Sequence, residues 1–358
     1  MKKAMTRESK PMMKCLSGLL ALCIVLTGIF FIAPIEAEAA VGNTFTAENG
    51  ISYKILTEEE DNYTVEISGV DVTKFKTYHD ETLPSIVEYN QTEYSVVGVG
   101  DQAFANKLQI NVHLPNSIRY IGDRAFHNHT GYVTLPEGIE TIGDYAFATS
   151  GSKFGTGENW NTLVIPSSVT SIGDYAFVDH AYLYSVTTSA KNIGAHAFDS
   201  CNALKTITLT DGVEIVGEYA FAYGNQSDYR YITLAESITT IGDYAFYRNY
   251  ITNAQDIELP KALKKIGRFA FAQNNADAYT PIVDFIFNEG LLEIGEGAFS
   301  GSKITEISLP NSLITIGNNA FANTDLTSVI IPKNVETIGT QAFYQCASKT
   351  LSENGNAK

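Results

Sequence analysis

The sequence predicts a repeat solenoid, in which short coils stack on one another. A β-branched residue, Gly, two variable residues and Ala-Phe recur as a six-residue motif, from residues 99–104 to residues 338–343. Successive copies lie 21 to 30 residues apart, a period typical of solenoids whose units cannot bury a core alone. The copies end at eleven phenylalanines: Phe104, Phe126, Phe147, Phe177, Phe198, Phe221, Phe246, Phe271, Phe299, Phe321 and Phe343. We therefore expect about eleven coils over residues 99–346.

The unit at residues 162–177 shows how one coil is expected to fold. Its Leu-Val-Ile segment alternates in direction like a short strand, and Pro166 ends the pairing because it has no N–H. We expect Gly173 to relieve strain in a turn and Asp174 to cap a short helix that ends at Phe177. Each coil thus predicts a parallel β-sheet on one face and short helices or turns on the other.

Acidic residues recur directly after the motif glycine, and they raise the question of calcium. They are Asp101, Asp123, Asp144, Asp174, Glu218, Asp243 and Glu296. Helix capping explains them without metal, and the chain has no Gly-Gly-x-Gly-x-Asp nonapeptide of the calcium-binding kind. His113, His127 and His129 lack a full ligand set and fit a surface turn. We expect no metal and no cofactor.

The order of strand, proline and Ile-Gly-x-x-Ala-Phe resembles the leucine-rich repeats of the BspA-like surface protein family, over residues 83–346. The Asn of the commoner leucine-rich pattern is absent. The resemblance implies a leucine-rich-repeat solenoid in a secreted or cell-surface bacterial protein. It also implies adhesion to host matrix, host-cell or microbial surface proteins.

The ends of the chain depart from the repeat. Residues 1–39 combine a basic front, an apolar run and Ala37-Glu38-Ala39, which predicts a signal peptide cleaved before Ala40. An uncleaved membrane anchor is the alternative. Residues 40–98 alternate like exposed strands and are expected to form a hairpin-rich N-terminal cap. The polar residues 347–358 are expected to be a disordered tail.

The charge of the chain narrows the choice of partners. The formal net charge is −16, and the leader holds five basic and three acidic residues, so its removal would leave −18. Such a chain repels phosphate backbones and anionic membranes, so we expect no nucleic acid and no stable membrane insertion after cleavage. Cys201 and Cys346 lie six repeats apart and cannot reach each other, so both are expected to be free.

Aromatic residues supply the candidate binding sites. Trp160, Tyr229 and Tyr231 belong to or border segments that exceed the basic period, where repeat proteins place recognition. Tyr145, Tyr175, Tyr219 and Tyr244, with Phe269, share one motif position and should align as a stripe, which serves either recognition or packing. The outward residues of the predicted strands, mostly Thr, form a second candidate surface for protein or polysaccharide.

The sequence therefore favours a binding and adhesion module over an enzyme. No Gly-x-Ser-x-Gly nucleophile elbow is present, and each acidic residue has a capping or turn role. A cell-envelope scaffold that binds wall polysaccharide is the main alternative, and a glycan-active enzyme ranks last.

Overall fold

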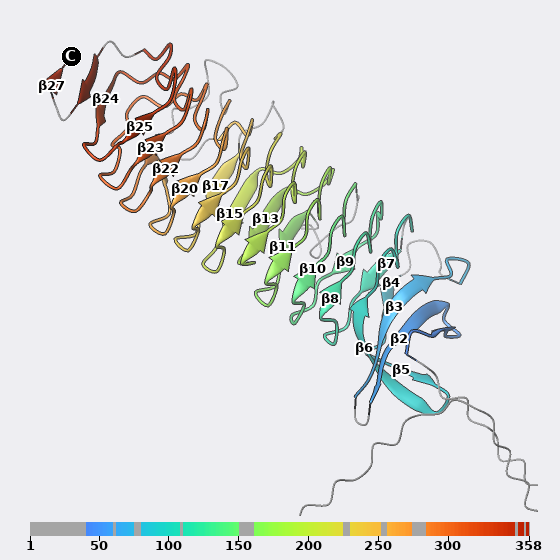
Figure 1. Cartoon of the computed structure of the whole chain (residues 1–358). Coiled ribbons are helices and arrows are strands. Elements are labelled where there is room, and N and C mark those ends of the chain that lie inside the picture. The colour runs from blue at the N-terminus through green and yellow to red at the C-terminus, as the bar shows by residue number, and fades with distance from the viewer. Residues whose placement is uncertain are drawn as a thin grey trace, which may run out of the picture. The chain divides into compact units, whose positions relative to one another are not determined.

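The computed structural model describes residues 41–59, 62–74, 80–107, 110–149, 161–224, 230–251, 256–273 and 284–347, and the backbone of 350–353 and 356–357. The chain divides into two compact units, Met1–Glu38 and Ala39–Lys358. The first unit, which contains nearly all of the expected leader, lies outside the described residues. Within the second unit the described residues form strands and turns and no helix (Figure 1).

The N-terminal strands form the first part of a long sheet. They are β1 (Thr44–Thr46), β2 (Ile51–Glu59), β3 (Asn62–Val70), β5 (Ile86–Tyr89) and β6 (Thr92–Val99). Strands β1, β2 and β3 pair antiparallel, as do β5 and β6, whereas β3 and β6 pair parallel. Phe45 stacks between Tyr53 and Tyr89, with ring centroids 5.4 and 4.2 Å away. These rings belong to the hydrophobic core that continues through the repeats.

The same sheet continues from β6 through the repeats as two-residue strands directly before the motif glycines. These are β8 (Tyr120–Ile121), β10 (Thr141–Ile142), β12 (Ser171–Ile172), β14 (Asn192–Ile193), β16 (Ile215–Val216), β18 (Thr240–Ile241), β20 (Lys265–Ile266), β22 (Glu293–Ile294), β23 (Thr315–Ile316) and β25 (Thr337–Ile338). All of them pair parallel in register. This sheet was not predicted from the sequence, because two residues are too few to show an alternating pattern.

The predicted strands form a second series of parallel ladders. One ladder joins β4 (Asp80–Thr82), β7 (Asn111–His113) and β9 (Val133–Thr134), and another joins β11 (Thr162–Val164), β13 (Ser185–Thr188), β15 (Thr206–Leu209) and β17 (Tyr231–Thr233). The others join β19 (Ile257–Glu258) to β21 (Phe285–Ile286), and β24 (Ser328–Ile331) to β26 (Thr350–Glu353) and β27 (Asn356–Ala357). Residues 307–309, which precede Pro310 as the strand segment of the unit at residues 162–177 precedes Pro166, form no strand.

Of the short helices or turns expected after the motif glycine, the structure has turns with left-handed residues, so only the helix expected to end at Phe177 is wrong. Tyr145 and Thr149 have φ of 55° and 48°. The N–H groups of Tyr145, Phe147 and Thr149 donate to carbonyls of the next coil at 2.7–2.9 Å. Those of Ala146 and Ala148 close turns within the coil at 3.4 and 3.1 Å. The backbone is thus satisfied between coils, and no donor is left for a helical ladder.

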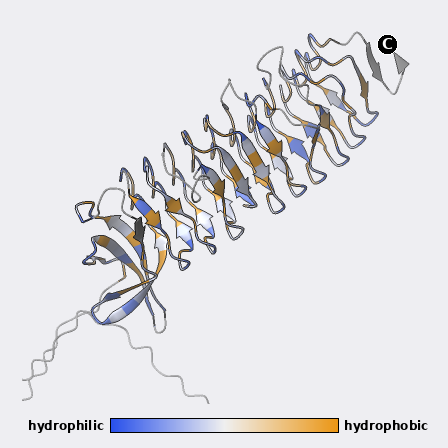
Figure 2. Cartoon of the chain, turned by 180° about the vertical axis from the view of Figure 1, so that it is seen from behind, coloured by the Kyte–Doolittle hydropathy of each residue, from blue (hydrophilic) through white to orange (hydrophobic). Residues whose placement is uncertain are grey.

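The predicted structural role of the phenylalanines is confirmed. The eleven motif rings form one continuous stack, with neighbouring centroids 4.9–5.5 Å apart and planes within 10° of parallel. Hydrophobic residues alternate with hydrophilic ones within the strands around them (Figure 2). Each coil therefore completes its core with its neighbours.

The motif glycine is required by close packing of coils and not by turn strain. A Cβ on Gly173 would lie 2.6 Å from the carbonyl carbon of Gly143 and 2.7 Å from the nitrogen of Asp144. Gly173 has no positive φ, so the reason expected from the sequence is wrong. Only glycine lets successive backbones approach this closely.

The C-terminal residues also differ from expectation, because part of the tail expected to be disordered is paired. Strand β26 continues the ladder of β24, and β27 returns antiparallel beside β26. Cys201 is buried, Cys346 is half-buried and both are free, as predicted.

Candidate functional site

The predicted tyrosine stripe exists, and it forms one aromatic stack through six coils. Its members are Tyr145, Tyr175, His196, Tyr219, Tyr244 and Phe269, with neighbouring centroids 4.5–5.1 Å apart. The guanidinium carbon of Arg124 lies 4.8 Å from the Tyr145 centroid and covers that end of the stack. All six rings are half-buried. Their faces cover one another, so only ring edges are available to a ligand.

His196 is the member of this stack that sequence reasoning missed. It occupies the same motif position as the tyrosines, between Gly194 and Phe198, and this alignment could have found it. Its Nδ1 lies 2.7 Å from Oδ2 of Asp199, and Ser200 donates to Oδ1 of that carboxylate at 2.9 Å. The carboxylate fixes the orientation of the imidazole between Tyr175 and Tyr219.

The stack stabilises an unfavourable backbone conformation. Each of its members has a positive φ, from 52° for Phe269 to 57° for Tyr175, which costs roughly 1–2 kcal/mol for a residue with a Cβ. Each stacked pair returns about 0.5–1.5 kcal/mol beyond its buried area. Desolvation by burial raises the pKa of Tyr175 and of Tyr219. These observations give the tyrosine stripe a packing role.

A different set of side chains is exposed, on the outward face of the ladder β11–β13–β15–β17. Tyr231 at the start of β17 is 52% exposed, and Val164 at the end of β11 is 64% exposed. Tyr184, directly before β13, is 43% exposed, and Nζ of Lys205 lies 5.6 Å from its ring centroid. Of the predicted binding residues, the structure places Tyr231 on this face. Trp160 and Tyr229 lie outside the described residues.

The hydroxyl groups of this face are uncommitted. Within the described part of the chain, Thr162, Ser185, Thr187, Thr206, Thr208 and Thr233 make no side-chain hydrogen bond. Hydroxyls elsewhere join coils: Thr170 and Thr239 each donate to a backbone carbonyl of the preceding coil at 3.1 Å. The face of β11–β17 therefore presents donors and acceptors that the fold does not use.

A buried arginine fixes the start of β17, directly before Tyr231. Arg230 is 1% exposed and donates to the carbonyl of Cys201 at 2.7 Å and to Oδ1 of Asn249. Burial lowers the pKa of its guanidinium to about 10. Gly224 leaves room for it, because a Cβ there would lie 2.6 Å from Arg230 Nε.

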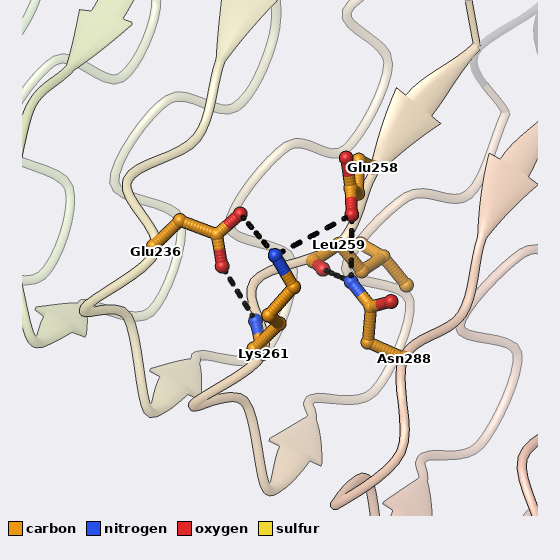
Figure 3. A network of polar contacts seen from close by, with 5 residues as sticks. All are labelled: Glu236, Glu258, Leu259, Lys261 and Asn288. Carbon is orange, nitrogen blue, oxygen red and sulfur yellow. Dashed lines mark hydrogen bonds and ion pairs between the residues drawn. The ribbon is translucent and has the colours of Figure 1, made fainter.

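The neighbouring coils carry a polar network of another kind (Figure 3). Lys261 Nζ lies 3.6 Å from Glu236 and 4.0 Å from Glu258, and the Lys261 backbone N–H donates to Glu236 at 3.1 Å. Asn288 donates to Glu258 and to the carbonyl of Leu259. These groups satisfy one another across three coils. We assign the network to inter-coil bracing, with the small energy typical of exposed ion pairs.

The aspartates after the motif glycines also join coils, so the helix-capping role expected for them is wrong. Oδ1 of Asp123 accepts from the N–H of Asp144 at 2.9 Å, and Oδ1 of Asp144 accepts from the N–H of Asp174 at 2.8 Å. In the same way, Oδ1 of Asn318 accepts from the N–H of Thr340 at 2.8 Å. Among the described residues no group of three or more His, Cys, Asp or Glu could hold a metal ion. No helix there is long and apolar enough to span a bilayer.

The chain is similar to several solved bacterial structures. The pneumococcal vaccine antigen PcpA aligns over 88% of this chain and 82% of its own, with a TM-score of 0.56 and 24% identity. A leucine-rich cell surface protein from Faecalibacterium prausnitzii aligns over 88% of this chain and 95% of its own, with a TM-score of 0.39 and 21% identity. A leucine-rich repeat protein from Bacteroides ovatus aligns over 86% of this chain and 94% of its own, with a TM-score of 0.40 and 21% identity. No curated protein matches the sequence.

The repeat itself matches a known family model. The model of the BspA type leucine-rich repeat region matches residues 97–224, 152–277 and 273–353. These matches cover the coils whose Phe stack, motif glycines and strand ladders are described above. The chain belongs to the BspA-type leucine-rich repeat family.

Proposed function

We propose that the chain is exported and acts at the bacterial surface as a binding module for macromolecules on a host or microbial surface. The family match and the leader pattern of residues 1–39 support export. The repeat architecture supports binding, because stacked coils offer a long regular surface.

One observation carries the proposal: exposed aromatic and apolar side chains gather on a single face of consecutive coils. Tyr184, Tyr231 and Val164 lie on or beside the ladder β11–β17, where none of them contributes to the core. Large exposed side chains that cluster on a sheet mark interaction sites more often than single exposed ones do.

Export is tested by expressing the full chain in a bacterium and sequencing the N-terminus of the protein recovered from the surface and the medium. We expect it to begin at Ala40, because Ala37 and Ala39 are the small residues that signal peptidase requires. Replacing Ala39 by a bulky residue should block processing. An uncleaved chain retained in the cytoplasm would contradict the proposal.

Binding is tested by adding the secreted chain to isolated bacterial walls, to whole bacteria and to immobilised host matrix proteins. We expect retention on at least one of these surfaces, and loss of retention in the variant Tyr184→Ala/Tyr231→Ala. Tyr344→Ala is the matched control, because Tyr344 is 48% exposed in a distant coil. Retention on none of them, or equal retention of both variants, would contradict the proposal.

A further inference from the structure

We propose that the outward face of β11–β13–β15–β17 binds an uncharged polysaccharide that lies across the four strands. This inference rests on the proposed surface-binding function and names its ligand class. It is argued from the register of the strands, from their unused hydroxyls, from two exposed rings and from charge.

The register of the four strands arranges the outward side chains in two straight rows. Paired Cα positions place Thr162, Ser185, Thr206 and Tyr231 in one row and Val164, Thr187, Thr208 and Thr233 in the other. Neighbouring members of a row are about 4.8 Å apart, and the rows are separated by two residues along each strand, about 7 Å. This lattice of side chains suits a ligand that repeats along its length.

The chemistry of the rows is that of a sugar-binding surface. Six of the eight side chains carry an aliphatic hydroxyl, which both donates and accepts, and those six make no hydrogen bond within the described part of the chain. A polysaccharide offers matching donors and acceptors at regular intervals. The β-branched Thr side chains are stiff, so they lose little entropy on binding.

Two exposed rings lie at this face. Tyr231 ends the first row, and Tyr184 directly precedes Ser185 of the same row. Both rings are about half exposed, and neither belongs to the tyrosine stack; Nζ of Lys205 lies over the Tyr184 ring, 5.6 Å from its centroid. An exposed ring face is the surface on which the C–H face of a pyranose packs, with the phenol oxygen left to hydrogen-bond.

Charge favours a neutral ligand over an anionic one. None of the eight row residues is charged, whereas the whole chain has a formal net charge of −16. An anionic polysaccharide would approach an acidic molecule and find no cation in either row. Beside the rows, Lys205 at the Tyr184 ring is a single positive charge. A protein partner fits less well, because hydroxyls make up six of the eight row positions, and the exposed Val164 and Tyr231 belong to the two outer strands β11 and β17 and do not adjoin each other.

The test is native electrophoresis of the secreted chain in gels cast with one polysaccharide each. The uncharged probes are hydroxyethylcellulose, laminarin, galactomannan and dextran, and the anionic probe is alginate. We expect at least one uncharged probe to retard the wild type and alginate to leave it unaffected. Tyr184→Ala/Tyr231→Ala should weaken the affinity at least about tenfold, since buried aromatic contacts dominate such sites.

Matched variants separate the hydroxyls from the shape of the face. Thr187→Val/Thr208→Val keeps the β-branched shape and the strand propensity, and it should also weaken retardation. Tyr344→Ala should behave as the wild type, and thermal midpoints report whether each variant is folded. Three outcomes would overturn the inference: no uncharged probe retards the wild type, alginate retards it as strongly, or the Tyr184/Tyr231 variant binds unchanged. If one of these outcomes occurs and the chain still adheres to matrix proteins, the polysaccharide inference fails while the proposed surface-binding function stands.

Discussion

At the scale of single residues, the third position after each motif phenylalanine shows how the coils fill their interior. Among the described residues it holds mostly buried polar or small side chains, and three of them donate to a phenylalanine carbonyl of the preceding coil: Cys201 Sγ to Phe177 at 3.1 Å, Asn249 Nδ2 to Phe221 at 2.7 Å and Cys346 Sγ to Phe321 at 3.1 Å. Gly224 has no side chain to offer at this position. The guanidinium of Arg230 occupies the space instead.

Because the guanidinium of Arg230 fills the space that a side chain at position 224 would occupy, substitutions at these two positions should have coupled effects on stability. Arg230→Ala should lower the free energy of unfolding by about 2–4 kcal/mol, because it leaves a cavity and unpaired carbonyls. Gly224→Cys alone should also destabilise, because its Cβ meets the guanidinium. The double variant should be more stable than Arg230→Ala, as chemical denaturation would show. If the two losses simply add, Arg230 does not fill the place of residue 224.

His129 lies at the same motif position and predicts a dependence of stability on pH. Burial lowers the pKa of its imidazole to about 4 from the usual 6.5. Between pH 4 and 6.5 the unfolded chain therefore binds more protons at His129 than the folded chain does. The stability is fully present above about pH 6.5 and falls by up to about 3 kcal/mol as the pH drops to 4.

The variant His129→Cys is the control for this pH effect, because Cys201 occupies the equivalent place in another coil. Thermal midpoints measured from pH 7.5 to 4 should fall less steeply in the variant than in the wild type. Parallel curves would show that His129 does not titrate as burial predicts.

At the scale of elements, each turn owes its shape to hydrogen bonds with the next coil. The N–H groups of Tyr145, Phe147 and Thr149 donate to carbonyls of the next coil, and Oδ1 of Asp144 accepts from the N–H of Asp174 in that coil. Asp144 serves here as an acceptor, and its charge is not required for that role. The ladder should therefore depend on geometry and not on a bound cation.

This role predicts a difference between two substitutions at Asp144. Asp144→Ala removes the acceptor of the Asp174 N–H and should cost about 0.5–1.5 kcal/mol. Asp144→Asn keeps an acceptor, as Asn318 does naturally, and should remain near the wild type. EDTA should leave both thermal midpoints unchanged. An equal loss in the two variants, together with a calcium-dependent rise in the wild type, would indicate a cation site instead.

The parts of the fold that repeat side-chain patterns could be predicted from the sequence, whereas the parts set by inter-coil backbone contacts could not. The Phe stack, the strand that contains Leu163 and the alignment of the tyrosines follow from the sequence pattern. The segment Asp-Tyr-Ala-Phe was expected to be helical because its left-handed backbone is imposed by the next coil, which no local pattern reveals. The roles of His196 and Arg230 were not predicted for the same reason. Each depends on contacts with neighbouring coils that the local sequence does not show.

At the scale of the whole molecule, the scaffold and the proposed binding surface use different tyrosines. Tyr175 and Tyr219 stack within the solenoid, with His196 between them, whereas Tyr184 and Tyr231 are exposed at the ladder β11–β17. Both pairs come from neighbouring coils, so a change in either pair perturbs the same region. Stability should therefore respond to changes in Tyr175 and Tyr219, and binding to changes in Tyr184 and Tyr231.

The most direct measurement compares the thermal midpoint and the polysaccharide affinity of two double variants. Tyr175→Asn/Tyr219→Asn removes ring stacking without adding backbone strain, because Asn319 adopts the same left-handed conformation at its own motif position. It should lower stability by about 1–3 kcal/mol and leave the affinity unchanged. Tyr184→Ala/Tyr231→Ala should keep the midpoint and lose the affinity. Loss of affinity in the Asn variant at temperatures where it is folded, with binding intact in the Ala variant, would contradict the account.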